Sequence, residues 1–168
     1  MNAITDASPL IACRQLPRLV DLIAKQFDRV LVTEAVFREA VGVAMEHPDP
    51  ERATSARELL RRFEAGPFSR TAMKRGERLD LRLGPGELEA ISLAHARKIR
   101  TLLVDDAKAS RVAASLGLQP VSTVAIVVRG FRRSHVASAE ARALVQRLLE
   151  VHLFLSPGVV SRILSMLD

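Results

Sequence analysis

The sequence alternates short apolar runs with longer segments in which apolar residues recur at helical spacing. Four runs rich in leucine or β-branched residues are predicted strands: residues 3–5, 30–33, 101–104 and 120–122. Strands that are apolar along their length and are separated by helices indicate a parallel sheet with helices on both faces. The alternation therefore predicts the α/β fold class.

Apolar spacing also predicts the helices, at residues 9–12, 17–27, 34–43, 50–65, 87–98, 107–116, 124–132, 138–149 and 157–167. Thr33 is the expected N-cap of one helix, Gly86 opens another, and Gly117 follows a third as a C-cap signal. Residues 46–84 have the least regular pattern and are predicted to form an exposed helix and a mobile connection. No repeat and no Pro/Gly/Ser-rich linker divides the chain, so we expect one domain.

The composition favours anionic partners and argues against a metal site built from cysteine or histidine. Twenty-five Lys and Arg against nineteen Asp and Glu give a net charge of +6, which favours phosphate-bearing or other anionic partners. The single cysteine, Cys13, cannot form an internal disulfide or a thiolate cage for a metal. The histidines are scattered along the chain and are expected to be surface or core residues rather than zinc ligands. They are His47, His95, His135 and His152.

The chain shows no signal for export or for membrane insertion. Residues 1–6 lack the basic residues of a signal peptide, and the longest apolar run covers residues 124–128. A membrane span needs about 20 apolar residues. We therefore expect a cytoplasmic protein with no membrane partner.

Asp6 is an acidic residue in an informative position. It follows the first predicted strand and precedes the turn Ala7-Ser8-Pro9. Ligands of open parallel sheets bind at the carboxyl ends of the strands, so this carboxylate is a candidate site residue. The alternative is that Asp6 only caps the helix that begins near Pro9.

Glu87 and Glu39 fall on the apolar sides of their predicted helices. At about 100° per residue, Glu87 lies within the stripe of apolar residues at 88–94, whereas Glu89 lies on the opposite side. An unpaired carboxylate on a buried face is costly, so a metal, a basic partner or a proton is expected there. The alternatives are that Glu87 stays hydrated in the first helical turn and that Glu39 pairs with an arginine.

Asp105 and Asp106 directly follow the predicted strand at 101–104. Successive strand residues point to opposite faces, so one acid can face a site while the other caps the next helix, and the sequence does not decide which. The alternative is that both only cap. A compact parallel sheet would gather these acids with Asp6, and carboxylates so placed raise one another's pKa unless a cation neutralises them. Such oxygen ligands suit Mg²⁺ or Mn²⁺.

Four motifs carry a resemblance to a known family. They are DASPLIA at 6–12, TEAVFRE at 33–39, GPGELEAISLA at 84–94 and LLVDDAKA at 102–109. In order and spacing they resemble the successive motifs of the PIN-domain nucleases. A prokaryotic branch of that family is the most similar, because its members also continue into a leucine-rich helical tail, here residues 145–166. The resemblance covers nearly the whole chain.

The resemblance implies a three-layer α/β/α fold with a central parallel sheet, made of one PIN-like domain over residues 1–168. The core would span about residues 1–134, and extra helices would form a C-terminal extension over about 135–168. The implied site is an acidic pocket that holds Mg²⁺ or Mn²⁺ and hydrolyses single-stranded RNA.

The family's catalytic acids match five residues of this chain: Asp6, Glu39, Glu87, Asp105 and Asp106. All but Glu39 are implied metal ligands, and Glu39 is expected to act as a supporting carboxylate or at a second metal. Ser8 and Thr123 match the polar residues that support the acids. The chain departs from the common pattern at Ala7, at Glu87 and at Ser122-Thr123, where Thr, Asp and Gly-Thr are frequent.

Many relatives are toxins, so the resemblance implies a metal-dependent endoribonuclease that is the toxin of a type II toxin-antitoxin pair. An antitoxin protein would then cover the acidic pocket, and an apolar face would serve a homodimer. Two other functions stay open from the sequence. One is a non-catalytic PIN-like module that binds nucleic acid or protein, and the other is a Mg²⁺-dependent phosphoryl-transfer enzyme.

Basic residues outside the acidic pocket are expected to bind the RNA backbone. The principal candidates are Arg97, Lys98, Arg100, Arg129, Arg132 and Arg133. Arg57, Arg61 and Arg62 are further candidates, and the alternative for them is a solvated helix face. The chain has no Trp or Tyr to form a stacking platform, so binding is expected to depend on phosphate contacts and on salt.

Overall fold

The computed structural model describes residues 1–151, 153 and 155–168, without the side chain of Glu64. His152, and with it part of the predicted tail, lies outside the described residues. At the centre is a five-stranded sheet in which every strand pairing is parallel, in the order β3-β2-β1-β4-β5. The strands are β1 Asn2–Thr5, β2 Arg29–Thr33, β3 Phe68–Thr71, β4 Thr101–Leu103 and β5 Gln119–Val121.

The strand order reverses direction at β1. The chain first moves outward from β1 to β2 and β3, and then returns across the sheet to β4 and β5 on the other side. Ile4 of β1 is therefore in register with Leu31 of β2 on one side and with Leu102 of β4 on the other. The carboxyl ends of β1 and β4 form the topological switch point, where open α/β sheets bind ligands.

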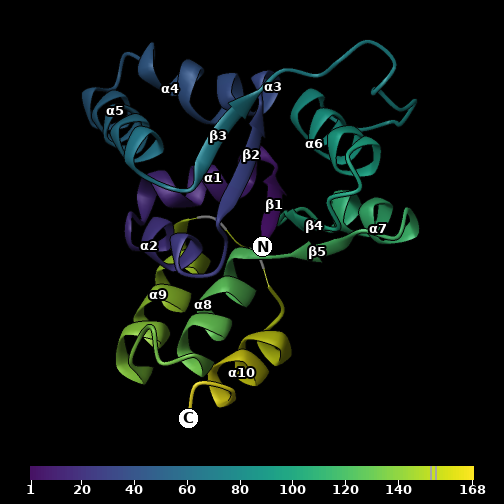
Figure 1. Cartoon of the computed structure of the whole chain (residues 1–168). Helices are drawn as coiled ribbons and strands as arrows, with labels where there is room; N and C mark the ends of the chain where they lie inside the picture. Colours follow the sequence, from purple (N-terminus) through teal and green to yellow (C-terminus); the bar gives the residue numbers. More distant parts are fainter. Residues whose placement is uncertain (152, 154) are drawn as a thin grey trace.

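Helices cover both faces of the sheet, which confirms the predicted three-layer α/β/α fold (Figure 1). Helix α6 packs over β1, β2 and β4, and α7 lies beside it, whereas α1, α2, α8 and α9 pack together on the other side. The helices are α1 Ala7–Gln15, α2 Arg18–Ala24, α3 Glu34–Phe37, α4 Val43–Met45, α5 Pro50–Ala65, α6 Pro85–Ala96, α7 Ala107–Ser115, α8 Thr123–Arg132, α9 Ser138–Val151 and α10 Pro157–Ser165, with a π-helical turn, η1, at Arg38–Gly42. In the described part of the chain, none of these helices has the length and hydropathy needed to cross a bilayer.

Strand β3 lies in the region predicted to be an exposed helix and a mobile connection, so that prediction was wrong for residues 68–71. The segment has a single apolar residue, Phe68, which packs on Phe63 with ring centroids 4.9 Å apart. Strand β3 pairs only with β2 and is an edge strand, and edge strands tolerate polar and charged residues. Its sequence therefore lacks the continuous apolar run by which the inner strands were recognised.

Most predicted helices differ by one to three residues at an end, and α6 begins at Pro85 with Gly84 as its N-cap rather than at Gly86. Two helices differ more. Helix α1 begins at Ala7 with Asp6 as its N-cap, rather than near Pro9, and runs on to Gln15. The single helix predicted at 34–43 is divided by the wider turn η1 and continues to Met45. Apolar periodicity does not reveal the wider turn, because the spacing of apolar residues across the whole segment is still that of a helix.

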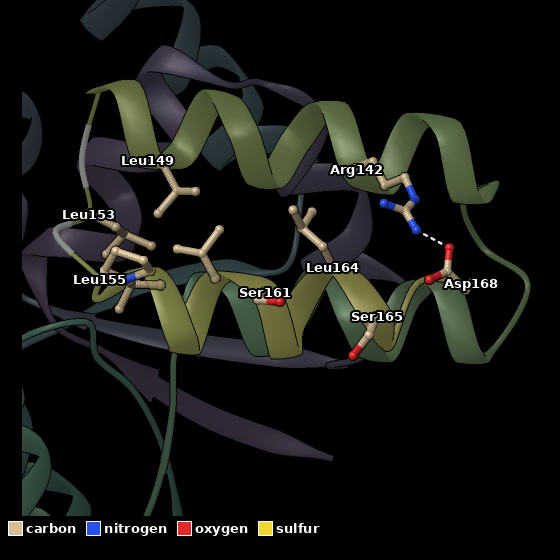
Figure 2. Close-up of a pocket in the computed structure, with 10 residues that line it drawn as sticks. Arg142, Leu149, Leu153, Leu155, Ser161, Leu164, Ser165 and Asp168 are labelled. Carbon is tan, nitrogen blue, oxygen red and sulfur yellow. Dashed lines mark hydrogen bonds and ion pairs between the residues drawn. The ribbon is translucent and has the colours of Figure 1, made fainter.

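The chain ends in a pair of helices, α9 and α10, that lie side by side (Figure 2). Arg142 of α9 forms an ion pair with Asp168, and the hydroxyl of Ser138 donates to the carbonyl of Leu167. Leu149 and Leu164 point into the space between the two helices. No residue of α10 itself is fully buried, so this helix is held less extensively than the rest of the fold.

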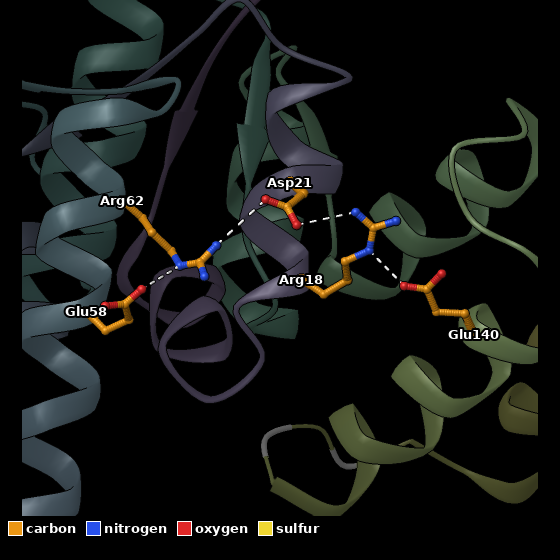
Figure 3. Close-up of polar contacts among 5 residues, drawn as sticks. All are labelled: Arg18, Asp21, Glu58, Arg62 and Glu140. Carbon is orange, nitrogen blue, oxygen red and sulfur yellow. Dashed lines mark hydrogen bonds and ion pairs between the residues drawn. The ribbon is translucent and has the colours of Figure 1, made fainter.

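A chain of ion pairs crosses α5, α2 and α9 (Figure 3). Arg62 contacts Glu58 at 3.2 Å and Asp21 at 3.8 Å. Arg18 contacts the same Asp21 at 3.3 Å and Glu140 at 2.7 Å. These side chains are partly exposed, so each pair contributes little to stability. Arg62 is therefore paired with acids of its own helix and of α2.

Gly66 connects α5 to β3, and a side chain at this position would collide with the backbone. A Cβ on Gly66 would lie 2.6 Å from the carbonyl oxygen of Arg62. We expect Gly66→Ala to lower the free energy of unfolding by about 1–3 kcal/mol, because the helix end must shift. Gly158 in α10 faces open space, so Gly158→Ala is the matched control and should leave stability unchanged or raise it slightly, since alanine favours a helix. Urea unfolding of both variants measures the difference, and equal stabilities would contradict the assigned role of Gly66.

Candidate active site

Asp6 and Asp105 lie together at the switch point of the sheet. Asp6 directly follows β1, and its N–H donates to the carbonyl of Leu103 at 3.0 Å, which extends the ladder between β1 and β4. Asp105 follows Val104, just beyond the end of β4. The pairing of these two central strands therefore brings together two acids that are 99 positions apart in the sequence.

Ser8 connects the two acids. Its backbone N–H donates to Oδ1 of Asp6 at 2.7 Å, and its hydroxyl lies 3.3 Å from the same oxygen. The same hydroxyl accepts from the N–H of Asp105 at 3.3 Å. Asp6 is thus both the N-cap of α1 and a member of the acidic site, so the two interpretations of this residue hold together.

The structure separates Asp105 from Asp106, which the sequence could not do. Asp105 accepts from the backbone N–H and the hydroxyl of Thr123, at 2.8 and 3.0 Å, and it faces the site. Asp106 is exposed and caps α7 by accepting from the N–H of Ala109 at 2.7 Å. The structure therefore places Asp105 at the site and Asp106 at the cap of α7, and the metal-binding role of either acid stays a prediction.

Glu87 and Glu39 approach from α6 and η1. Glu87 is half-buried, and its Oε2 accepts from the N–H of Gly84, the N-cap of α6, at 3.0 Å. The carboxylate of Glu39 lies against the same helical turn, because a Cβ on Gly86 would come within 2.7 Å of its Oε2. Glycine at 86 therefore leaves the space that Glu39 occupies.

Glu39 belongs to the π-helical turn η1, and turns of this kind frequently occur at functional sites. The buried side chain of Arg14 donates to the carbonyl of Ala40 at 3.2 Å and so ties this turn to α1. On the other side, Glu89 accepts from the N–H of Ala35 at 3.1 Å and holds α3 against α6. These contacts fix the segment that carries Glu39.

The acids of the site lie close enough together to raise one another's pKa. The pKa of Asp6 is raised to about 7, first through burial and then through the charges of Glu87, Asp105 and Glu39, against the lowering effect of the Ser8 N–H. The carboxyl of Glu39 also has a raised pKa, first through burial and then through Glu87. Within the described residues, no ion pair neutralises Asp6, Glu39 or Glu87. This arrangement therefore favours the binding of a proton or a cation.

The donor set fits a hard divalent cation in its chemistry. It consists only of carboxylate oxygens, which suit Mg²⁺ or Mn²⁺ rather than zinc. In the part of the chain that the structure describes, no three acidic, histidine or cysteine side chains are arranged to hold an ion directly. Mg²⁺ keeps several of its waters and needs only one or two protein carboxylates, so the set fits such an ion through water-mediated contacts.

The predicted basic residues separate into three groups. Arg97 is engaged by Glu77 at 3.3 Å and by the hydroxyl of Thr71 at 3.1 Å. Lys98 and Arg100 precede β4 and so lie at its amino end, away from the acids. Arg129 and Arg132 of α8, and Arg133 at its end, are exposed. Arg129 and Arg132 line a hollow that is also lined by Asp105.

Three residues that shape the site were not recognised from the sequence as parts of it. Gly86 was interpreted as a helix start, although a glycine in the first helical turn, where alanine would be more favourable, was the available signal. Glu89 was placed on the outer side of its helix, where it meets α3 rather than solvent. Arg14 gave no signal, since its partner is a backbone carbonyl 26 positions away.

The comparisons with known proteins agree with this architecture. A family model described as a PIN domain matches residues 2–168. Among solved structures, the chain is similar to a PilT N-terminus domain protein from the hyperthermophilic archaeon Sulfolobus solfataricus P2. The identity is 16%, the TM-score is 0.51, and the match covers 75% of this chain and 90% of that chain. At this identity the likeness concerns the fold alone. No curated protein matches the chain.

The raised pKa of Asp6 predicts how stability depends on pH without metal. The unfolded chain releases this proton near the ordinary value of 3.8 and the folded protein near 7, so ionisation opposes folding increasingly over this range and fully above it. We expect Asp6→Asn, which keeps the acceptor for Ser8, to raise Tm by roughly 5–10 °C at pH 8. The gain should vanish near pH 4.

Thermal unfolding in EDTA at several pH values measures this difference. Asp106→Asn is the matched control, because it changes an exposed capping acid to another good N-cap residue and should leave Tm unchanged at every pH. A lower Tm for Asp6→Asn at pH 8 would mean that the Asp6 carboxylate is stabilised rather than destabilised where it lies.

Proposed function

Because the chain belongs to the PIN-domain family, we propose that it is a metal-dependent endoribonuclease that hydrolyses phosphodiester bonds in single-stranded RNA. PIN domains are generally nucleases and typically use divalent metal ions. The observation that carries the proposal is the buried carboxylate of Asp6 at the switch point, with Asp105, Glu87 and Glu39 around it. Such a site has the negative charge needed to hold a cation and lies where the fold presents ligands.

Asp6, Glu87 and Asp105 are the residues that would hold the ion. When bound, a divalent ion makes water a better nucleophile at neutral pH and polarises the phosphate. In the hydrolysis, a water oxygen bonds to phosphorus, one P–O bond to a ribose oxygen breaks, and the proton from water ends on that leaving oxygen.

The neighbouring residues orient these carboxylates. Ser8 donates to Asp6 through its N–H, Thr123 donates to Asp105 through its N–H, and the hydroxyl of each donor lies within reach of both oxygens of its acid. Glu39 reaches the site from η1 and contributes charge next to Glu87. We assign Glu39 the role of a supporting carboxylate or of a ligand of a second ion.

We also propose that this nuclease is the toxin of a type II toxin-antitoxin pair and acts on RNA in the cytoplasm as one domain with a C-terminal helical extension. The resemblance of the sequence motifs to that prokaryotic branch supports this proposal. Its antitoxin would cover the carboxylates with a basic side chain, and an apolar face would join two copies. Growth arrest on expression of the wild-type chain, but not of Asp105→Asn, would support the toxin role.

One observation favours a second candidate, a binding module without catalysis. The carboxylates of Asp6 and Glu87 already accept from helix N-termini, and the described residues form no ready three-ligand metal site. A module of this kind would bind RNA or protein but would not bind Mn²⁺ through its acids.

The two adjacent aspartates provide a sharp test of the proposed nuclease. We expect purified protein to cleave a labelled single-stranded RNA with Mg²⁺ or Mn²⁺ and not with EDTA. Asp105→Asn should reduce the rate by about 100-fold, because it removes an ion-binding carboxylate. Asp106→Asn should keep nearly the full rate, since asparagine preserves the cap of α7.

Calorimetry with Mn²⁺ completes the test. Loss of cleavage in Asp106→Asn but not in Asp105→Asn would overturn the assignment of the site. No cleavage by the wild type, together with no Mn²⁺ binding, would favour the binding module.

A further inference from the structure

A groove begins at the acidic site and follows α8 toward its end. It has a volume of about 360 Å³ and lies between α8 and α10, with Asp105 among the residues that line it. Asp105 and Ser122 lie at one end, where α8 begins. Arg129 and Arg132 line it further along the same helix. The groove therefore connects the candidate active site to two of the predicted RNA-binding residues.

The walls of the groove between these ends are apolar and come mainly from two helices, with Leu153, Leu155 and Met166 beside them. They are formed by Val124, Ala125 and Val128 of α8, and by Val159 and Ile163 of α10. The α10 residues are only partly buried, although the side of the helix that faces the groove is apolar. A flat apolar or aromatic group placed here would be covered on both sides by aliphatic side chains.

The far part of the groove is positively charged. Arg129 and Arg132 are exposed and lie three residues apart, on the same side of α8 as Ala125. Neither forms an ion pair with another of the described residues. At 1.5 Å per residue, they are about 10 and 15 Å along the helix axis from Ser122. The two positive charges therefore lie beyond the apolar section, at the end of the groove far from the acids.

We propose that this groove binds the nucleotide adjacent to the bond that is cut. The base lies between the apolar walls of α8 and α10, and Arg129 and Arg132 bind the phosphates that follow it. This inference rests on the proposed nuclease function and adds to it a subsite for a base. An unpaired base can enter such a groove, whereas a base within a helix is stacked and paired, so the groove selects single-stranded RNA.

Size and charge favour a nucleotide over a protein segment as the occupant. The groove is at the lower end of the range of about 300–1,000 Å³ that is common for small-molecule pockets, which suits one base. Its two arginines lie where a chain of phosphates would continue from the site. Asp105 is the one acid that lines it among the described residues, and it belongs to the proposed catalytic set.

Binding without cleavage tests the groove directly. Fluorescence anisotropy in EDTA measures the affinity of the full chain for a labelled single-stranded RNA and for an abasic ribose-phosphate oligomer of the same length. We expect Arg129→Ser combined with Arg132→Ser to weaken binding of both oligomers and to lower the salt-dependence slope by about 2. Arg133→Ser, a neighbouring exposed arginine outside the groove, should have a smaller effect on both.

A second variant fills the apolar section. Ala125→Phe should weaken binding of the RNA by roughly 10-fold, within the range for loss of one base contact, and should leave the abasic oligomer unaffected. Ala143→Phe, at an exposed position of α9, is the matched control and should bind as the wild type does. Circular dichroism melting checks that each variant is folded.

The outcomes separate this inference from the proposed function. Normal RNA binding by both groove variants would overturn the subsite, even if the wild type cleaves RNA, and would leave the groove for a protein partner. Equal weakening of the RNA and the abasic oligomer by Ala125→Phe would overturn the base contact. If the wild type does not cleave but its RNA binding depends on the groove, the subsite stands and the catalytic proposal fails.

Discussion

The burial of one carboxylate, that of Asp6, constrains the centre of this protein. Asp6 is 3% exposed, and burial together with three neighbouring acids raises its pKa to about 7. A charged carboxylate in such a place is costly unless it is neutralised. Selection for stability alone therefore does not explain why the acid is there. The surrounding contacts hold the acid there: the ladder to β4, the cap of α1 and the hydroxyl of Ser8. The site is therefore built into the junction of the two central strands.

Helix capping and the acidic site share the same side chains. Asp6 caps α1, Glu87 binds the N-terminus of α6, and Thr123 in the first turn of α8 holds Asp105. In a parallel sheet the helix that follows a strand begins at the strand's carboxyl end, so caps and ligands gather at the same edge. This explains why capping and site membership, which are alternatives when the sequence is considered alone, coincide at Asp6.

The inner strands and most helices could be predicted because their signals are local. Residues 30–33 and 101–104 are apolar except for one threonine each, and α5 has the predicted limits, since Asp49 and Pro50 mark its start. Strand β3 was missed because an edge strand with one buried face needs few apolar residues, and Arg70 in it is held by Glu34 and by the ring of Phe37. For the site, projection onto a helix correctly placed Glu87 on a partly buried side, whereas the side chain of Glu39 is exposed and only its carboxylate lies against Gly86. Their roles as metal or supporting carboxylates stay predictions.

The sequence by itself determined the α/β class, the parallel sheet and the set of acids that such a sheet would gather, because these follow from periodicity and from positions next to strands. Only the tertiary structure decided that Asp105 and not Asp106 faces the site, because both follow the same strand and only contact with Thr123 of α8 distinguishes them. It also decided that Gly86 leaves room for Glu39, and that Arg129 and Arg132 line a groove reaching Asp105 whereas Arg100 lies at the opposite end of its strand. These outcomes depend on pairs of residues far apart in the sequence, and their relation exists only once the elements are packed.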